Sequence, residues 1–142
     1  MPADNVDIEF EPYTNQELGI QGVVPAGWAE VQPGIFARSS PTVDMAVLQI
    51  AVEQNISVEE MLEAISEGYG LDGTPEINVE RVANDLTWSL YTFEVQGVPR
   101  DLALAESEGL TLLLLMRSAA DEQDVLYEVV FLPIVDVLTL VE

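Results

Sequence analysis

The chain of 142 residues contains 26 acidic residues and four arginines but no lysine, histidine or cysteine, which gives a net charge of −22 at pH 7. This charge argues against nucleic-acid binding and against docking on an anionic membrane, because both depend on Lys and Arg. Without Cys and His the chain forms no disulfide, no Cys-based zinc site and no Ser-His-Asp triad. A hydrophobic content of 49% nevertheless predicts a folded domain with a core.

The chain contains no internal repeat and no low-complexity segment. Residues 1–8 are polar and are expected to form a flexible lead-in, followed by a single domain over residues 9–142. No signal peptide is visible in the polar, acidic first residues. The chain could start at a native N-terminus or be a domain excised from a longer protein.

Strand patterns dominate the chain, with one helical interval in the middle. Alternating or β-branched stretches bounded by turn residues predict strands at 10–13, 18–24, 29–31, 34–38, 45–53, 77–82, 86–95, 100–106 and 110–117. Helical spacing of apolar residues predicts an amphipathic helix from Val58 to Tyr69. Ser57 and Glu60 form a capping box at its start, and Gly68 and Gly70 end it.

The run 110–117 is apolar on both faces of a strand. Leu112, Leu114 and Met116 point one way, and Leu113 and Leu115 point the other way. Only the three residues 107–109 separate this run from the preceding strand, so the two strands must form an antiparallel hairpin. We therefore expect an α+β fold, in which a central strand of an antiparallel sheet is covered by helices on both faces.

The second helix needed for this cover is predicted near the C-terminus. Residues 121–131 have helical spacing of apolar residues. Pro133 is expected to interrupt the helix because it lacks a backbone donor. Residues 134–141 then form either a second short helix or an extended tail.

The order of elements resembles the PsbP-like fold, an α/β/α sandwich named for an extrinsic photosystem II protein. The local resemblance lies in Leu18-Gly19-Ile20 and Val24-Pro25-Ala26-Gly27-Trp28, which is similar to the strand and Pro-x-x-Trp opening of those domains. The chain also looks like accessory domains of secreted or surface bacterial proteins, some of which follow α/β-hydrolase-type domains. The resemblance implies a bacterial, extracellular or cell-surface, non-catalytic module. Because Lys and His are missing, no metal-binding or photosystem-docking residue is carried over from the family.

Our leading prediction is therefore a non-catalytic accessory or interaction domain, which is part of a larger bacterial protein or binds one as a partner. A cationic partner would suit the acidic surface, although acidity can also serve solubility alone. Trp28, Tyr13 and Phe36 lie near strand ends and are candidates for partner or ligand contact. A small-molecule-binding or calcium-binding module is the first alternative.

No cofactor is expected, and calcium is the stronger hypothesis for a site, because Ca²⁺ takes only oxygen ligands. The candidate ligands are Asp72, Thr74 and Glu76 in a loop, and Asp121, Glu122 and Asp124 at the start of the C-terminal helix. Neither set follows the EF-hand pattern. Acids at a helix start are also favoured by the helix dipole without any metal.

A carboxylate-only hydrolase is the second alternative, since two carboxyl groups suffice for glycoside hydrolysis. Asp136 is the acid that stands out, because it lies inside the apolar run 131–141. If its carboxyl group were buried, its pKa would be raised. The competing interpretation is that Asp136 caps a helix or faces water.

Overall fold

The computed structural model of the chain describes residues 9–17, 19–32, 34–38, 46–71, 73, 75, 77, 79–83, 86–107 and 109–140. The strands are β1 (Phe10–Asn15), β2 (Ile20–Pro25), β3 (Ala29–Gln32), β4 (Ile35–Ala37), β5 (Val47–Gln54), β6 (Val79–Ala83), β7 (Leu86–Val95), β8 (Val98–Ser107), β9 (Leu110–Arg117) and β10 (Thr139–Leu140). The helical segments are α1 (Val58–Gly68), α2 (Gln123–Leu126), the π-helical turn η2 (Tyr127–Phe131) and α3 (Leu132–Val137). The expected lead-in, residues 1–8, lies outside the described residues.

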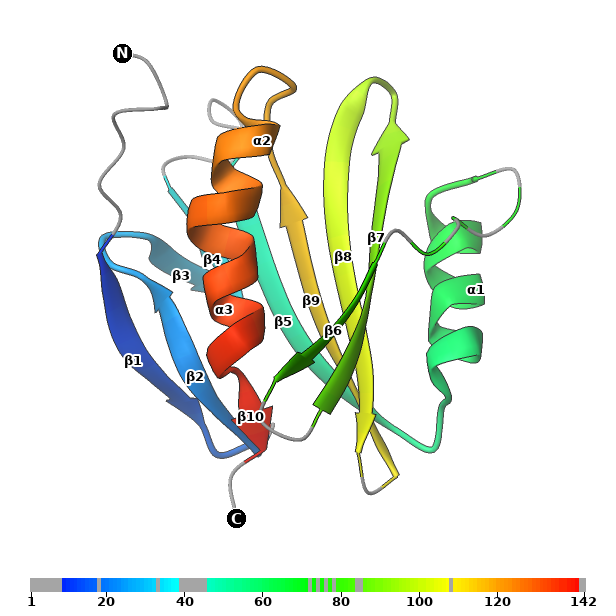
Figure 1. Cartoon of the computed structure of the whole chain (residues 1–142), viewed down its shortest axis with the longest axis horizontal. Helices are drawn as coiled ribbons and strands as arrows, with labels where there is room; N and C mark the ends of the chain where they lie inside the picture. The colour runs from blue at the N-terminus through cyan, green and yellow to red at the C-terminus, as the bar shows by residue number, and fades with distance from the viewer. Residues whose placement is uncertain are drawn as a thin grey trace.

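A seven-stranded antiparallel sheet forms the centre of the molecule, in the order β3-β4-β5-β9-β8-β7-β6 (Figure 1). β9 is its middle strand and pairs with β5 on one side and β8 on the other. The β8–β9 connection is the tight turn that the sequence predicts, with Gly109 at a φ of +82° that favours glycine. The expected antiparallel sheet with 110–117 at its centre is confirmed.

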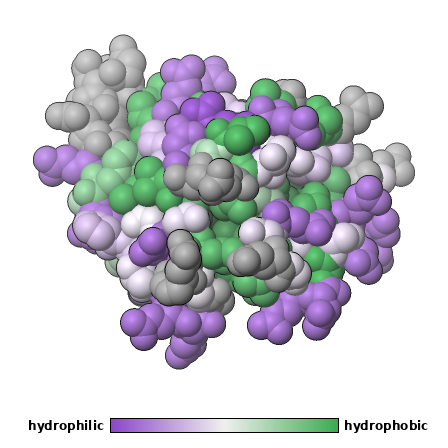
Figure 2. All heavy atoms as spheres, turned by 60° about the horizontal axis from the view of Figure 1, so that its bottom comes forward, coloured by the Kyte–Doolittle hydropathy of each residue, from purple (hydrophilic) through white to green (hydrophobic). Residues whose placement is uncertain are grey.

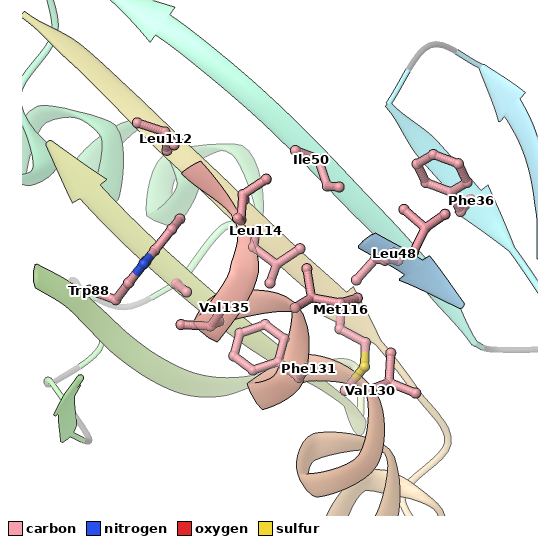
Figure 3. Close-up of a cluster of buried hydrophobic side chains, with 14 of the residues drawn as sticks. Phe36, Leu48, Ile50, Trp88, Leu112, Leu114, Met116, Val130, Phe131 and Val135 are labelled. Carbon is pink, nitrogen blue, oxygen red and sulfur yellow. The ribbon is translucent and has the colours of Figure 1, made fainter. Parts of the chain in front are cut away.

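The larger hydrophobic core lies between one face of this sheet and the C-terminal helical segment. Leu112, Leu114 and Met116 of β9 are 0% exposed and cluster with Phe131 and Val135, which come from the helical segment (Figure 3). Trp88 of β7 is also 0% exposed in this cluster, as expected for a core tryptophan. The residues between them in each strand point to the opposite face of the sheet, because successive side chains of a strand alternate between the two faces.

A smaller cluster on the opposite face packs around α1. It contains Met61 and Leu62 of α1 together with Leu113 and Leu115 of β9. Both hydrogen bonds of the predicted capping box are present at Ser57. In addition, the backbone N–H of Val58 donates to the Glu106 carboxylate of β8 at 2.8 Å, which ties the start of α1 to the sheet.

The expectation of complete helical cover on both faces is not confirmed. The fold is mostly sheet, and α1 is the only described helix whose residues join the second cluster. Gln49 and Ala51 of β5 are half-buried on that side, and Glu53 is exposed. These residues and Met61 line a hollow of about 410 Å³ beside α1. A single helix of eleven residues, such as α1, covers too small an area to shield one whole face of a seven-stranded sheet.

The C-terminal helical segment is continuous through Pro133, so the expected interruption there is wrong. The N–H of Leu132 donates to the carbonyl of Tyr127, five residues earlier, within η2. This wider turn comes directly before Pro133, which takes an early position of α3. A proline is tolerated there because the π-helical turn before it departs from the α-helical hydrogen-bond pattern in which the missing N–H would be needed.

A second, three-stranded sheet of order β1-β2-β10 flanks the main one. β10 follows α3 and pairs with Ile20 and Gln21 of β2, so the end of the described chain is part of the fold. A Cβ added at Gly22 would lie 3.2 Å from the backbone of Leu138, so a glycine allows this close approach. In the described part of the chain, no helix is both long and apolar enough to span a membrane.

Candidate functional site

A buried carboxyl group on β8 is the feature of the molecule with the most unusual chemistry. Asp101 lies on the face of β8 that carries Ala103 and Ala105, and it is only 1% exposed. Its partner in the ladder with β7 is Thr92, and its partner in the ladder with β9 is Met116. The sheet register therefore fixes an acid at the end of the larger core, where the start of the C-terminal helical segment covers it.

Hydrogen bonds satisfy only one oxygen of this carboxylate. The Thr92 hydroxyl donates to Asp101 Oδ1 at 3.0 Å, and the Gln123 amide donates to the same oxygen at 3.3 Å. Oδ2 is buried and has no hydrogen-bond partner among the described residues. Burial raises the pKa of Asp101 from 3.8 to about 6, since the two hydrogen bonds only partly oppose the loss of solvation.

A hollow of about 320 Å³ opens beside this carboxyl group. Besides Thr92 and Asp101 from the sheet, its lining includes Gln123 and Asp124 of α2 and Tyr127 of η2. Asp124 adds a second negative charge, which raises the pKa of Asp101 further. Burial, followed by the charge of Asp101, raises the pKa of Tyr127. The hollow is thus lined by two carboxyl groups, two hydroxyl groups and one amide, with no cation among its described lining residues.

From the sequence, Asp136 stands out among the acids and Asp101 does not. Asp136 is in fact at the surface and accepts two hydrogen bonds from Arg81, Nε to Oδ1 at 2.6 Å and Nη2 to Oδ2 at 2.7 Å. These hydrogen bonds hold the pKa of Asp136 below its ordinary value, so Asp136 is not a buried acid, and the interpretation that it faces water is confirmed. An acidic residue directly before the apolar run Leu102 to Ala105 was the signal that could have indicated Asp101.

The three aromatic residues predicted to contact a partner lie close together at the edge of the larger core. Trp28 and Phe36 are 7% and 4% exposed. Tyr13 packs edge-to-face on Phe36 with 5.1 Å between ring centroids, and its hydroxyl accepts from the Asn15 amide at 2.9 Å. Their burial gives these rings a structural role, and a contact with a partner through them stays a prediction.

The predicted calcium ligands fall into two groups. Asp72, Thr74 and Glu76 lie outside the described residues. At the helix start, Glu122 forms a two-fold ion pair with Arg38, Nη1 to Oε2 and Nη2 to Oε1 both at 2.8 Å. Asp121 is exposed, and Asp124 lines the hollow at Asp101. The described residues contain no group of three or more acids placed to hold a metal ion.

Comparisons with known proteins give one informative result. No protein-family model and no curated protein sequence matches the chain. The solution structure of cyanobacterial PsbP (CyanoP) from Synechocystis sp. PCC 6803 is similar, with a TM-score of 0.62 over 96% of this chain and 95% of that chain. The two sequences are 11% identical, so this likeness concerns the fold alone. The chain has a PsbP-like fold, as its element order predicts.

Proposed function

We propose that the chain is a non-catalytic accessory domain that binds a basic segment of a protein partner along the edge strand β6. The observation that carries the proposal is a sheet edge without a partner strand that carries exposed apolar side chains on both faces, in a chain with a net charge of −22. Catalysis is not proposed, because the side chains that most often serve as base or nucleophile, His, Cys and Lys, are missing from the chain.

The exposed apolar side chains lie where the main sheet ends. Among the described strands, β6 pairs only with β7, so its other edge has no partner strand, although α3 contacts β6 through the pair of Asp136 with Arg81. Val82 is 73% exposed, and Ile77 and Val79 are 49% and 47% exposed. An open strand edge offers backbone donors and acceptors to a partner strand, and exposed apolar side chains add contact area.

Charge decides which kind of partner suits this edge. Hydrophilic side chains surround exposed apolar atoms on the face seen in Figure 2. Glu80 lies next to Val79 and is exposed, while Arg81 is held by Asp136. A second copy of the chain would bring another net charge of −22 and be repelled. A basic segment would instead be attracted, which favours both its encounter rate and its specificity.

The test uses a seven-residue peptide of alternating Lys and Val, with a peptide of alternating Glu and Val as its control. Titration calorimetry measures affinity, and amide hydrogen exchange reports protection along β6. We expect Val82→Arg to weaken binding of the basic peptide by about tenfold. Val31→Arg is the matched control, because Val31 is 47% exposed on the other edge strand, β3. It should leave the affinity unchanged within about twofold.

Two results would overturn the proposal. Equal binding of the acidic peptide would remove the charge argument. Equal weakening by the Arg substitutions at positions 82 and 31, without protection of β6 amides, would mean that the basic peptide only collects on the acidic surface.

The wider setting follows the resemblance to the PsbP-like family. We place the domain outside the cytoplasm, at the bacterial cell surface or beyond, as part of a larger protein or bound to one. The PsbP-like fold supports a domain that assists another protein. Calcium binding and a carboxylate-only hydrolase stay predictions, and the small-molecule alternative is supported by the hollow at Asp101.

A further inference from the structure

We propose that the hollow at Asp101 binds a small organic cation through a primary ammonium group. The hollow is lined by Thr92, Asp101, Gln123, Asp124 and Tyr127. The Asp101 carboxylate is the anionic anchor of this site. The proposal concerns a different part of the molecule from the peptide-binding edge β6.

The first argument is the unsatisfied oxygen of a buried acid. Asp101 is 1% exposed, and its Oδ2 lacks a hydrogen-bond partner among the described residues. A buried carboxylate without full hydrogen bonding is costly, and one additional charged donor would offset much of that cost. An ammonium group supplies three N–H donors and a compensating charge, so it fits this need better than a neutral ligand does.

Second, the lining of the hollow is negatively charged. Two carboxylates, those of Asp101 and Asp124, line it. Arg38 pairs with Glu122, and Arg81, whose charge reaches Tyr127, is paired with Asp136. Because no cationic side chain lines the hollow within the described residues, the positive charge that it attracts must come from a ligand or solvent ion.

The third argument selects an organic cation over a metal ion. The described residues bring no three acids together for a metal, and Ca²⁺ needs six to eight oxygen ligands. The volume of about 320 Å³ instead suits a ligand of several heavy atoms, at the small end of the usual range of ligand pockets. The ring of Tyr127 adds a surface on which an alkyl chain or a cation can rest.

Gln123 is the lining residue that competes with the ligand for the carboxylate. Oδ2 is buried, so the ammonium group must displace a neighbouring side chain to reach it, and the Gln123 amide, which holds Oδ1, is the candidate that we propose. Its hydrogen bond to Oδ1 is long, at 3.3 Å, and therefore weak. We expect Gln123→Ala to leave binding intact or to strengthen it, whereas Asp101→Asn should weaken it by about tenfold or more through loss of the charge-assisted hydrogen bond.

The experiment titrates the ¹⁵N-labelled chain with n-butylamine, which is cationic at pH 7.5, and with neutral 1-butanol. Amide chemical shifts give both the affinity and the location of binding. We expect saturable 1:1 binding of n-butylamine, with shifts centred on Thr92, Asp101 and Tyr127, and no comparable response to 1-butanol. Below pH 6 the affinity should fall as Asp101 takes up a proton, because burial sets the pKa of this carboxyl group at about 6.

Controls separate the site from the acidic surface as a whole. Glu63→Gln makes the same charge change at an exposed position of α1, and it should leave the affinity unchanged. Equal effects of Asp101→Asn and Glu63→Gln on the affinity for n-butylamine would refute the site. Amide chemical-shift changes spread over the whole surface would refute it as well. A response to CaCl₂ and not to n-butylamine at equal ionic strength would also overturn it. Binding of the Lys-Val peptide should be unaffected by Asp101→Asn, so the two proposals can fail separately.

Discussion

Replacing Asp101 by Asn should remove a pH dependence of stability that the wild-type chain carries. Asp101 has a pKa of about 6 in the folded chain against an ordinary value of 3.8, because burial penalises its charge. The difference corresponds to roughly 3 kcal/mol of destabilisation when the carboxylate is charged in the folded state. Asn keeps the shape and an acceptor for Thr92 but carries no charge.

The direction of the effect follows from which state holds the proton. Above pH 6 both the folded and the unfolded chain have a charged Asp101, and the full destabilisation applies. Between pH 6 and pH 4 the folded chain binds a proton at Asp101 and the unfolded chain does not, so stability rises as the pH falls. Below pH 4 both states are protonated and the destabilisation has vanished.

The assay is urea unfolding at pH 5, 6, 7 and 8, followed by tryptophan fluorescence. Trp28 and Trp88 are both buried, so they report loss of the core. The range stops above the isoelectric point of about 4.1 to keep the chain charged and soluble. Between pH 8 and pH 5 the free energy of unfolding of the wild type should rise by roughly 1 kcal/mol relative to that of Asp101→Asn. Protonation of the other acids cancels in this difference, since both chains share them.

Two outcomes would contradict the reasoning. A constant difference between the two chains from pH 8 to pH 5 would mean that Asp101 is solvated in solution. A variant that is less stable than the wild type at pH 8 would mean that the charge is compensated by a partner. Glu63→Gln serves as the matched control, and its unfolding free energy should run parallel to that of the wild type.

Other consequences of the structure can be measured by unfolding as well. Ser57→Ala removes the acceptor for the Glu60 N–H and should lower stability by about 1 kcal/mol in urea unfolding; no change would mean that α1 does not depend on its cap. Leu114→Ala leaves a cavity in the larger core and should cost about 2 to 5 kcal/mol, seen as a lower denaturation midpoint. Arg38→Met breaks the half-buried two-fold pair with Glu122 and should cost about 1 kcal/mol, an effect that Glu122→Gln should largely remove in a double-mutant cycle. Raising NaCl should raise the melting temperature, because salt screens repulsion within a chain of net charge −22; a flat melting temperature would mean that the charges are too far apart to matter.

Local rules were enough to predict the elements that depend on neighbouring residues. The apolar run ending at Arg117 needed neighbours on both sides, and the short link before Leu110 left only an antiparallel hairpin. Ser57 and Glu60 form both predicted hydrogen bonds, since a capping box depends on residues three positions apart. In both cases the interacting groups lie within a few residues of one another in the chain.

The sequence prediction failed where the outcome depends on residues far apart in the chain. The apolar neighbours of Asp136 left a buried position open beside the favoured surface position, and its partner Arg81, 55 residues earlier, could not be predicted. Asp101 looked like one acid among many, and only the pairing of β8 with β7 and β9 places it under the helix. The error at Pro133 has a local cause instead, because the π-helical turn directly before it lets the helix continue.

Asp101 therefore links the stability of this domain to its proposed ligand. A neutral residue at this position would make the folded state more stable at neutral pH, so stability alone does not explain a carboxylate there. If Asp101→Asn both stabilises the chain and abolishes n-butylamine binding, the acid is a binding group retained at the expense of stability. If it stabilises the chain and leaves binding unchanged, the charge is only a structural cost, and the hollow at Asp101 has no anionic anchor.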